Sequence, residues 1–321
     1  MNYNLYFQRK FIEPDSCTPL DNTTFLFAYS NDFDPTDINF LAGSYFGSSP
    51  HYTTFAGIRF DTENEGEFEF QNTFDEILTY VHNHLPDASL SFDSNNTGSD
   101  VLRMIDRFLD NTVVPVCGSK MIIYVKRYPN ETDYSRIVAK MRQHHSYLTI
   151  FASNEPSGGY HPETLYDLAS KTNGICAFDD DDNMLYTYIH VETVFNPYLV
   201  YAANPQVSGN GRIQLPPLLV QAYDRYWFTM MMQGNGPMTV VQTVVLSWTN
   251  DNDDGQLGKN GTISSQGWFS GNHIGCFENL NTESYNLHVD FNYTDSKARR
   301  VQIRVHGRDE HPINYWVPYD N

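Results

Sequence analysis

The first half of the chain alternates short apolar runs with stretches of helical periodicity. Apolar runs occur at residues 25–27, 121–125 and 147–152, and each has the length of a strand rather than of a helix. Runs without a polar face are typical of strands that are covered on both sides of a sheet. Between them, apolar residues recur at helical spacing from Phe74 and again from about Ser99. The alternation predicts an α/β fold, a doubly wound and mostly parallel sheet with helices on both faces.

Particular residues mark the ends of several predicted elements. Thr73 and Glu76 stand three positions apart at the start of the first amphipathic stretch, which is the spacing of a capping box. Residues 66–71 alternate between glutamate and phenylalanine, which predicts a half-exposed edge strand. Pro162 suits the first turn of a later helix, and Gly174 stands where a glycine commonly ends one.

The pattern changes after about residue 190, where helical periodicity ends and strand-like runs recur between turn-rich spacers such as 250–261. Short strands separated by turn signals predict an all-β sandwich. We therefore expect an N-terminal segment at 1–20, an α/β domain at 21–192 and a β-sandwich domain at 193–321. The expected strands of the last domain lie at 199–203, 226–232, 239–249, 285–293, 301–306 and 313–317.

The charge and hydropathy of the chain exclude several classes of partner. With 20 basic and 39 acidic residues, the net charge is -19 at pH 7, which argues against binding to nucleic acid or to an anionic membrane surface. No window approaches the ~18 apolar residues that a membrane-spanning helix needs, so we expect no membrane insertion. The first residues lack the apolar core of a signal peptide, so none is visible in this sequence.

Four cysteines and five N-x-[ST] sequons bear on the cellular compartment. The cysteines form no C-x-x-C pair, which argues against a zinc ribbon or a thioredoxin-type site. About four sequons would arise by chance at this composition, so their number alone decides little. The glycosylation candidates are Asn22, Asn95, Asn130, Asn260 and Asn292.

Four segments between residues 22 and about 182 form a pattern, in chain order FLFAYSND, SNNTGSDVL, MIIYVKRYPN and LYDLASKTNG. With these segments, this part of the chain resembles a von Willebrand factor type A domain. The segments correspond to the family's strand with its D-x-S-x-S turn, its Gly/Thr-rich loop, its strand ending in T-D-G and its last helix. The order of predicted elements is also similar, including an antiparallel edge strand after the second strand. With a β domain behind it, the arrangement is similar to that of secreted nematode proteins.

The resemblance implies a divalent-metal adhesion site, whose ligand pattern this chain does not keep. In the family, the D-x-S-x-S turn, a loop threonine and the T-D-G aspartate bind the metal, which captures an acidic group of the partner. Alanine stands at the first aspartate position here, aspartate replaces the second serine, and a basic residue replaces the T-D-G aspartate. The aligned positions are Ala28, Ser30, Asp32, Asn95 or Thr97, and Lys126 or Arg127.

We expect this degenerate adhesion site to bind no metal and no other cofactor. A divalent ion needs oxygen ligands, whereas Ala28 offers none from its side chain and the basic residue adds a like charge. We predict that this basic side chain pairs with Asp32 instead. The alternative is an alignment shifted by a few residues, in which Asp34 or Asp133 restores a carboxylate ligand.

The resemblance also implies a disulfide. In a type A domain the first strand and the strand at Met121 are parallel neighbours, which places Cys17 and Cys117 towards the same edge of the sheet. Cys176 and Cys276 would then form the remaining pair. The alternative is four reduced thiols in a cytoplasmic protein.

Taken together, these features predict a non-enzymatic, extracellular binding or adhesion module that recognises a protein or a glycan. Defence is one role that such a module could have. The alternative is a hydrolase or lectin-like activity in the C-terminal β domain, whose loops are long. Its tryptophans could stack on sugars, although in a β-sandwich they are more often core residues. They are Trp227, Trp248, Trp268 and Trp316.

Overall fold

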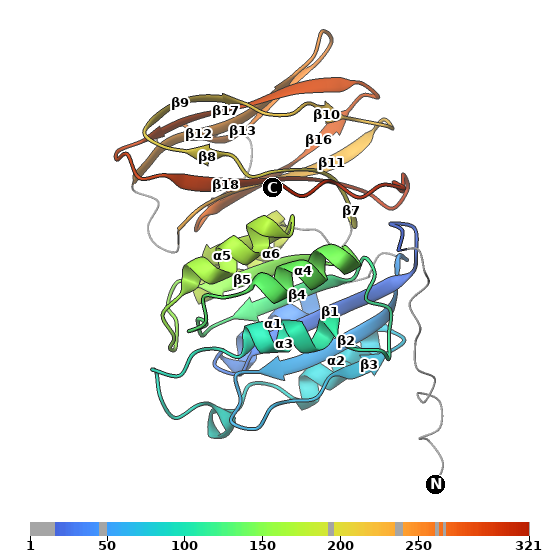
Figure 1. Ribbon diagram of the computed structural model, residues 1–321, viewed down its shortest axis with the longest axis vertical. Coiled ribbons are helices and arrows are strands. Elements are labelled where there is room, and N and C mark those ends of the chain that lie inside the picture. The colour runs from blue at the N-terminus through green and yellow to red at the C-terminus, as the bar shows by residue number, and fades with distance from the viewer. Residues whose placement is uncertain are drawn as a thin grey trace. The chain divides into compact units, whose positions relative to one another are not determined.

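The computed structural model describes residues 17–44, 50–191, 196–234, 240–260, 263–265 and 268–320 (Figure 1). The chain forms two compact units. The first comprises Met1–Ile150, Glu155–Gly174 and Asn314–Trp316, and the second comprises Phe151–Asn154, Ile175–Ile313 and Val317–Asn321. The predicted domain boundary between residues 192 and 193 lies outside the described residues. Within the described ranges, no helix is both long and apolar enough to cross a membrane.

Six strands of the N-terminal part form a sheet in the order β3-β2-β1-β4-β5-β6. Strand β1 lies between β2 and β4 and runs parallel to both, while β3 runs antiparallel to β2 at the edge. All eight residues of β1 are buried, as its apolar sequence predicts. The mostly parallel α/β sheet is therefore confirmed. The strands are β1 (Thr23–Ser30), β2 (Tyr52–Phe60), β3 (Glu69–Gln71), β4 (Lys120–Val125), β5 (Tyr147–Ser153) and β6 (Ile175–Asp179).

Helices cover both faces of this sheet (Figure 1). The helices are α1 (Pro35–Ser44), α2 (Phe74–Asn83), α3 (Val101–Leu109), α4 (Ser135–His144), α5 (Pro162–Lys171) and α6 (Met184–Val191), with short turns η1 (Ala88–Leu90) and η2 (Asp181–Asn183). Helices α3 and α4 contact each other, and Lys140 bridges them with an ion pair to Asp106 at 2.5 Å. The sequence pattern does not predict α6, because its β-branched and aromatic residues have low helix propensity.

Local sequence rules explain the ends of these elements only in part. The capping box is confirmed, since the Thr73 side chain accepts from the Glu76 N–H and the Glu76 carboxylate accepts from the Thr73 N–H. The edge strand is shorter than predicted, because only Glu69–Gln71 pair with β2. After α5 the left-handed residue is Asn173, with φ 55°, rather than Gly174. At Gly174 there is no room for a side chain, since a Cβ there would lie 2.4 Å from a backbone oxygen of β5.

The C-terminal part consists of two antiparallel sheets, so the predicted all-β fold is confirmed. One sheet has the order β10-β17-β12-β13-β14, with β9 also paired to β17. The other has the order β15-β16-β11-β18-β7, with β8 also paired to β18. The strands are β7 (Tyr198–Ala203), β8 (Gln206–Val207), β9 (Asn210–Gln214), β10 (Leu218–Leu219), β11 (Asp224–Met232), β12 (Val241–Thr249), β13 (Asp254–Asn260), β14 (Ile263–Ser265), β15 (Trp268–Ser270), β16 (His273–Leu280), β17 (Ser284–Tyr293) and β18 (Arg299–Gly307).

The inner faces of these two sheets share one apolar core. Phe228 of β11 and Trp248 of β12 stack across the sheets, with ring centroids 4.3 Å apart. Along β17, every second residue from Tyr285 to Phe291 is buried in this core, while its neighbours are more exposed. Two sheets packed through alternating inward side chains form a β-sandwich.

One predicted spacer of the sandwich is in fact a strand. Residues 250–261 include β13, which pairs with β12 along its whole length. The sequence suggests that Gly255 and Gly258 are turn residues. In the structure, both lie in β13 at points where atoms of β12 come too close for a side chain. A Cβ on Gly255 would lie 2.5 Å from the Trp248 ring, and one on Gly258 would lie 2.2 Å from the Val244 oxygen. Glycine within a strand often marks such an approach.

The predicted strand at 313–317 is wrong, because this segment is irregular and belongs in part to the first unit. Trp316 stacks on His145, with ring centroids 4.6 Å apart and planes inclined by 6°. Its indole N–H donates to the Cys17 carbonyl at 3.2 Å. Tertiary contacts of an aromatic side chain therefore hold the segment, and a strand-like composition cannot distinguish these from sheet pairing.

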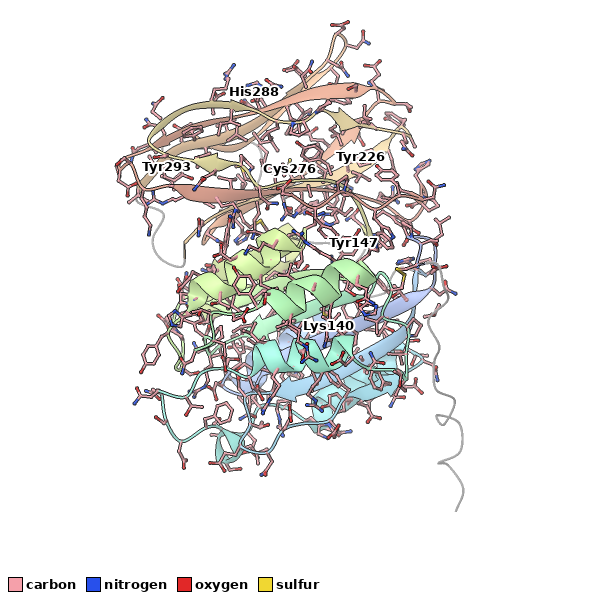
Figure 2. All side chains as sticks on the ribbon, in the orientation of Figure 1. Lys140, Tyr147, Tyr226, Cys276, His288 and Tyr293 are labelled. Carbon is pink, nitrogen blue, oxygen red and sulfur yellow. A yellow bond between two sulfur atoms is a disulfide. The ribbon has the colours of Figure 1, made fainter. Side chains whose placement is uncertain are left out.

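The cysteines form one disulfide. Cys17 and Cys117 are bonded, with Cα atoms 5.6 Å apart, as the resemblance implies. The predicted second bond is absent, since neither Cys176 nor Cys276 is part of a disulfide. Cys176 is fully buried in β6, and Cys276 packs against the sandwich core (Figure 2). Burial, with the nearby Glu278 carboxylate, raises the pKa of the Cys276 thiol to about 12, so it is unreactive at neutral pH.

Lys120 is a buried cation at the amino end of β4. Its residue is only 2% exposed, and its ammonium lies 5.8 Å from the ring centroid of Tyr147, which Figure 2 labels. Burial lowers the pKa of Lys120 from 10.5 to about 7. A lysine whose pKa is lower in the folded chain binds its proton less tightly there, so folding is disfavoured as the pH falls. The penalty grows from the unfolded pKa of 10.5 down to the folded pKa of about 7.

We predict that Lys120→Met gains stability relative to the natural protein as the pH is lowered from 10 to 7. The difference in free energy of unfolding should grow by at most about 1.4 kcal/mol per pH unit and level off below the folded pKa. Urea denaturation of both proteins at several pH values measures it. Lys297→Met, at an exposed position, is the control and should run parallel to the natural protein. A Lys120→Met difference that is constant across this range would contradict the prediction.

Candidate functional site

Loops gather at the carboxyl ends of the parallel strands, where open α/β sheets bind their ligands. They comprise residues 31–34 after β1, residues 126–134 after β4, residues 155–161 after β5, and residues 91–100, which lead into α3. We call these four loops the carboxyl edge. Backbone hydrogen bonds join three of them, for example from Tyr128 N to Gly158 O at 2.9 Å and from Gly159 N to Asn95 O at 3.1 Å.

A buried ion pair lies at the centre of the carboxyl edge. Arg127 Nε donates to Asp32 Oδ2 at 2.8 Å, and the two side chains are 3% and 5% exposed. Arg127 Nη1 also donates to the backbone oxygens of Ser94 at 2.9 Å and Thr97 at 2.8 Å. The guanidinium carbon lies 5.4 Å from the centroid of the Phe92 ring. One side chain therefore holds three of the loops together.

The loop after β5 closes on the same ion pair. The Ser157 hydroxyl donates to Asp32 Oδ2 at 2.5 Å, so this carboxylate oxygen accepts from both Arg127 and Ser157. Gly158 leaves room for the guanidinium, since a Cβ there would lie 2.4 Å from Arg127 Nη1. Gly159 has φ 75°, and a Cβ on it would lie 1.8 Å from a backbone oxygen of the 126–134 loop. All four loops of the carboxyl edge thus depend on one charged contact.

Beside the ion pair lies a second, fully buried carboxyl group. Asp61 directly follows β2 and has φ 60°, an uncommon conformation for a residue other than glycine. Its carboxyl oxygens accept from the hydroxyls of Ser30 at 2.5 Å and Ser99 at 2.7 Å, and from the Asp100 N–H at 3.0 Å. In return, the Asp61 N–H donates to the Asp100 carboxylate at 2.9 Å. Asp61 therefore ties the ends of β1 and β2 to the start of α3.

The Asp61 carboxyl favours its neutral form. Burial raises its pKa well above 3.8, and the negative charges of Asp100 and Asp32 raise it further, while the hydrogen bonds from Ser30 and Ser99 oppose the shift. A neutral Asp61 reduces the negative charge that the buried cluster must balance. Arg127 is the cation that pairs with Asp32.

The structure brings together only part of the set that the alignment suggests. The predicted pairing of a basic side chain with Asp32 is confirmed, and the partner is Arg127 rather than Lys126. Ala28 is fully buried inside β1. The Ser30 hydroxyl donates to the Asp61 carboxylate, and its oxygen accepts from the Asp32 N–H at 3.4 Å. The side chains of Asn95 and Thr97 are exposed, and only their backbone oxygens take part in the network.

The two aspartates of the shifted alignment have structural roles outside this network. Asp34 Oδ1 accepts from the Thr36 N–H at 2.7 Å at the start of α1. Asp133 Oδ1 accepts from the Ser135 N–H at 3.0 Å at the start of α4. Among the described residues, no group of three or more His, Cys, Asp or Glu side chains is placed to hold a metal ion.

Several residues of the network are not predicted from the sequence. Asp61 lies in a segment without a motif, Ser99 lies in the SNNTGSDVL segment but is not an aligned ligand position, and Ser157 lies in a loop that the alignment does not use. The only local signals are the polar residue directly after an apolar strand, at Asp61, and the Gly158-Gly159 pair beside Ser157. Neither signal indicates which distant residue is the partner.

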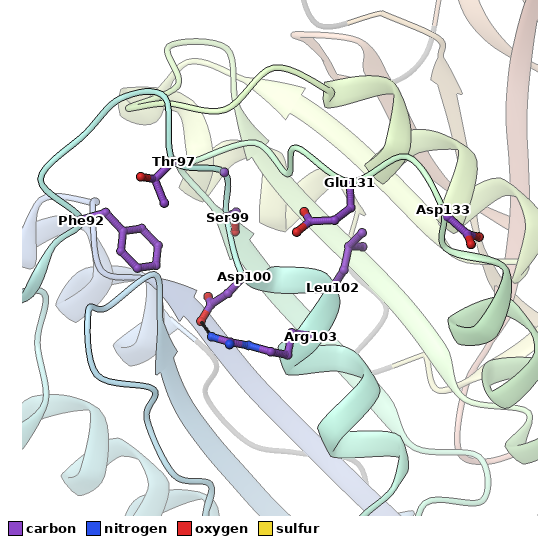
Figure 3. Close-up of a pocket in the computed structure, with 9 residues that line it drawn as sticks. Phe92, Thr97, Ser99, Asp100, Leu102, Arg103, Glu131 and Asp133 are labelled. Carbon is purple, nitrogen blue, oxygen red and sulfur yellow. Dashed lines mark hydrogen bonds and ion pairs between the residues drawn. The ribbon is translucent and has the colours of Figure 1, made fainter.

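A cavity of about 350 Å³ opens beside the network (Figure 3). In Figure 3, Phe92 and Glu131 lie on opposite sides, with Ser99 and Asp100 between them. Asp100 is paired with Arg103 at 3.1 Å at the rim. The full lining consists of Phe92, Thr97, Gly98, Ser99, Asp100, Leu102, Arg103, Glu131 and Asp133.

The tryptophans of the sandwich do not form an exposed stacking surface in the described residues. Trp248 is 1% exposed and Trp227 is 4% exposed. Trp316 is stacked on His145, and the side chain of Trp268 lies outside the described part. A sugar therefore cannot stack on Trp227 or Trp248 without opening the fold.

Comparison with known proteins gives one family match and several similar structures. Residues 203–308 match a family described as a domain of unknown function (DUF7154), and the sequence matches no curated protein. A von Willebrand factor type A structure from Catenulispora acidiphila is similar, with 9% identity and a TM-score of 0.39, over 92% of this chain and 59% of that chain. The mussel byssus proximal thread matrix protein 1, with a zinc-occupied MIDAS motif, is similar at 9% identity and a TM-score of 0.36, over 59% of this chain and 50% of that chain. This chain thus spans less than two thirds of either protein's length.

We predict that Arg127→Met destabilises the protein by about 3–5 kcal/mol, because it leaves the buried Asp32 charge without a partner. Arg127→Lys should cost less, since an ammonium keeps the charge but cannot bind Asp32 and both backbone oxygens at once. Arg103→Met is the matched control, and loss of its 59% exposed side chain should cost less than about 1 kcal/mol. Chemical denaturation measures all three, and equal costs at positions 103 and 127 would contradict the account.

We predict that Asp61→Asn gains stability relative to the natural protein as the pH rises above 4. A carboxyl group whose pKa is raised by folding binds its proton more tightly in the folded chain. Its contribution to the free energy of unfolding is therefore complete below the unfolded pKa of 3.8. It is lost as the pH rises through the folded pKa. Asparagine keeps the shape, tolerates positive φ and does not titrate. Thermal or urea unfolding of both proteins from pH 4 to pH 8 tests this, and two parallel curves would show it to be wrong.

Proposed function

We propose that the protein is a non-enzymatic, extracellular binding module that recognises a protein partner through its carboxyl edge without a metal ion. The single observation that carries this proposal is the Arg127–Asp32 ion pair, which fixes all four loops of the edge in place. Loops held by a rigid scaffold are a common means of protein recognition. Their preorganisation lowers the entropy lost on binding.

The outer side of the carboxyl edge is suited to contact. Tyr160 is 59% exposed and its hydroxyl is hydrogen-bonded to the Asn96 side chain, which orients the ring. Glu131 is exposed at the cavity rim. An oriented tyrosine supplies contact area at low entropic cost. The net charge of -19 favours a protein partner over nucleic acid.

The disulfide supports the extracellular part of the proposal. Disulfides persist in oxidising compartments and are rare in the cytosol. Cys17 and Cys117 are bonded across 100 residues of sequence, so the bond restrains a long loop of the unfolded chain. The remaining cysteines described here are buried or half-buried, and neither is an exposed thiol.

The test is a screen of the full-length protein on an array of purified extracellular proteins, with and without EDTA. We expect binding that EDTA does not change and that Tyr160→Ala weakens at least tenfold. Tyr186→Ala is the matched control, because Tyr186 is 58% exposed but lies on α6. Equal loss in both variants, or loss with EDTA, would overturn the proposed site. Turnover in an esterase and glycosidase panel would refute the non-enzymatic assignment.

A further inference from the structure

The structure distinguishes between sequons that the sequence treats alike. Asn22 lies directly before β1, Asn95 lies in the 91–100 loop and Asn130 lies in the 126–134 loop, and all three are exposed. Asn292 is half-buried inside β17, where β12 and β9 pair with it on both sides. The side chain of Asn260 lies outside the described part of the structure.

The two sequons at the carboxyl edge differ in what their amide groups do. Asn95 uses only its backbone oxygen, which accepts from the Gly159 N–H at 3.1 Å, and its side chain makes no hydrogen bond in the described structure. Asn130, by contrast, donates its amide Nδ2 to the Asn96 carbonyl at 2.8 Å. Its side chain also packs on Gly98, where a Cβ would lie 2.7 Å from the Asn130 amide carbon.

A sugar on Asn130 would disturb the buried ion pair. N-glycosylation puts a sugar ring on Nδ2, which here lies against residues 96–98. These residues include Thr97, whose backbone oxygen accepts from Arg127. The transfer removes one of the two Nδ2 protons and sets the ring against the loop that Arg127 holds. A sugar on Asn95 points into solvent and leaves the hydrogen bond from the Gly159 N–H to the Asn95 carbonyl intact.

The geometry points to N-linked glycans on Asn22 and Asn95, with Asn130 left unmodified. This inference rests on the extracellular part of the proposed function, since the disulfide and the glycan both require the secretory route. In the transfer, Nδ2 forms a bond to the sugar C1 of a lipid diphosphate-linked oligosaccharide. The C1–O bond to the diphosphate breaks, the lipid diphosphate leaves, and the amide gives up one of its two protons.

The glycan on Asn95 bears on partner recognition. Asn95 lies two positions before Thr97, which lines the cavity of the carboxyl edge. A partner that reaches the cavity therefore passes beside this glycan. A glycan at this position selects among partners by size, while that on Asn22 lies before β1 and outside the carboxyl edge.

The experiment expresses the full chain through the secretory pathway of insect cells behind a cleavable signal peptide, followed by intact-mass measurement and glycopeptide mapping of the secreted protein. We expect one glycan each on Asn22 and Asn95 and none on Asn130. Thr97→Ala should remove one glycan, and Thr132→Ala should remove none. This matched pair deletes the sequon hydroxyls while keeping both asparagines, and Thr97 and Thr132 are both exposed.

A glycan on Asn130 in the secreted, disulfide-bonded protein would overturn the inference, as would an unmodified Asn22 or Asn95. These outcomes do not depend on whether the proposed binding function is right. The glycan occupancy of each asparagine is measured by mass spectrometry, which needs no binding partner. Repeating the array screen with Thr97→Ala then tells whether the Asn95 glycan restricts binding. A screen without any partner would leave the glycan assignment standing.

Discussion

The buried Arg127–Asp32 ion pair is the contact on which the carboxyl edge depends. Removing two opposite charges from water is costly, and the cost is recovered only where hydrogen bonds satisfy the remaining donors and acceptors. Here the guanidinium binds one carboxylate and two backbone oxygens, and the carboxylate also accepts from Ser157. A planar group with several fixed donors suits this task better than an ammonium does. The arrangement explains why Arg127, and not the adjacent Lys126, takes the buried position.

The charge balance of the edge follows from the same constraint. Three acidic residues, Asp32, Asp61 and Asp100, lie close together, and Arg127 is the cation paired with Asp32. The raised pKa of Asp61 favours its neutral form, and Asp100 is paired with Arg103. Side chains of the chain itself therefore pair with the acidic groups of the carboxyl edge. This charge balance is the physical basis of our proposal that the carboxyl edge binds a partner without a metal ion.

The sequence predicts the parts of this structure that depend on local periodicity. The parallel sheet follows from uninterrupted apolar runs such as β1, and the capping box at Thr73 follows from spacing alone. The ion pair at Asp32 was predictable because the resemblance aligned a basic residue with a carboxylate. The choice of Arg127 and the role of Ser157 were not, since each depends on how far one loop reaches toward another. Likewise, β13 and the Trp316 contact are set by tertiary packing that composition does not encode.

A double-mutant cycle measures whether Arg127 and Asp32 act as one buried contact. The free energy of unfolding is measured for the natural protein, Arg127→Met, Asp32→Asn and the double variant. If the two side chains act as one buried contact, the double variant is more stable than the sum of the single losses predicts, with a coupling energy of about 2–3 kcal/mol. Additivity to within about 0.5 kcal/mol would show that the pair does not hold the carboxyl edge together.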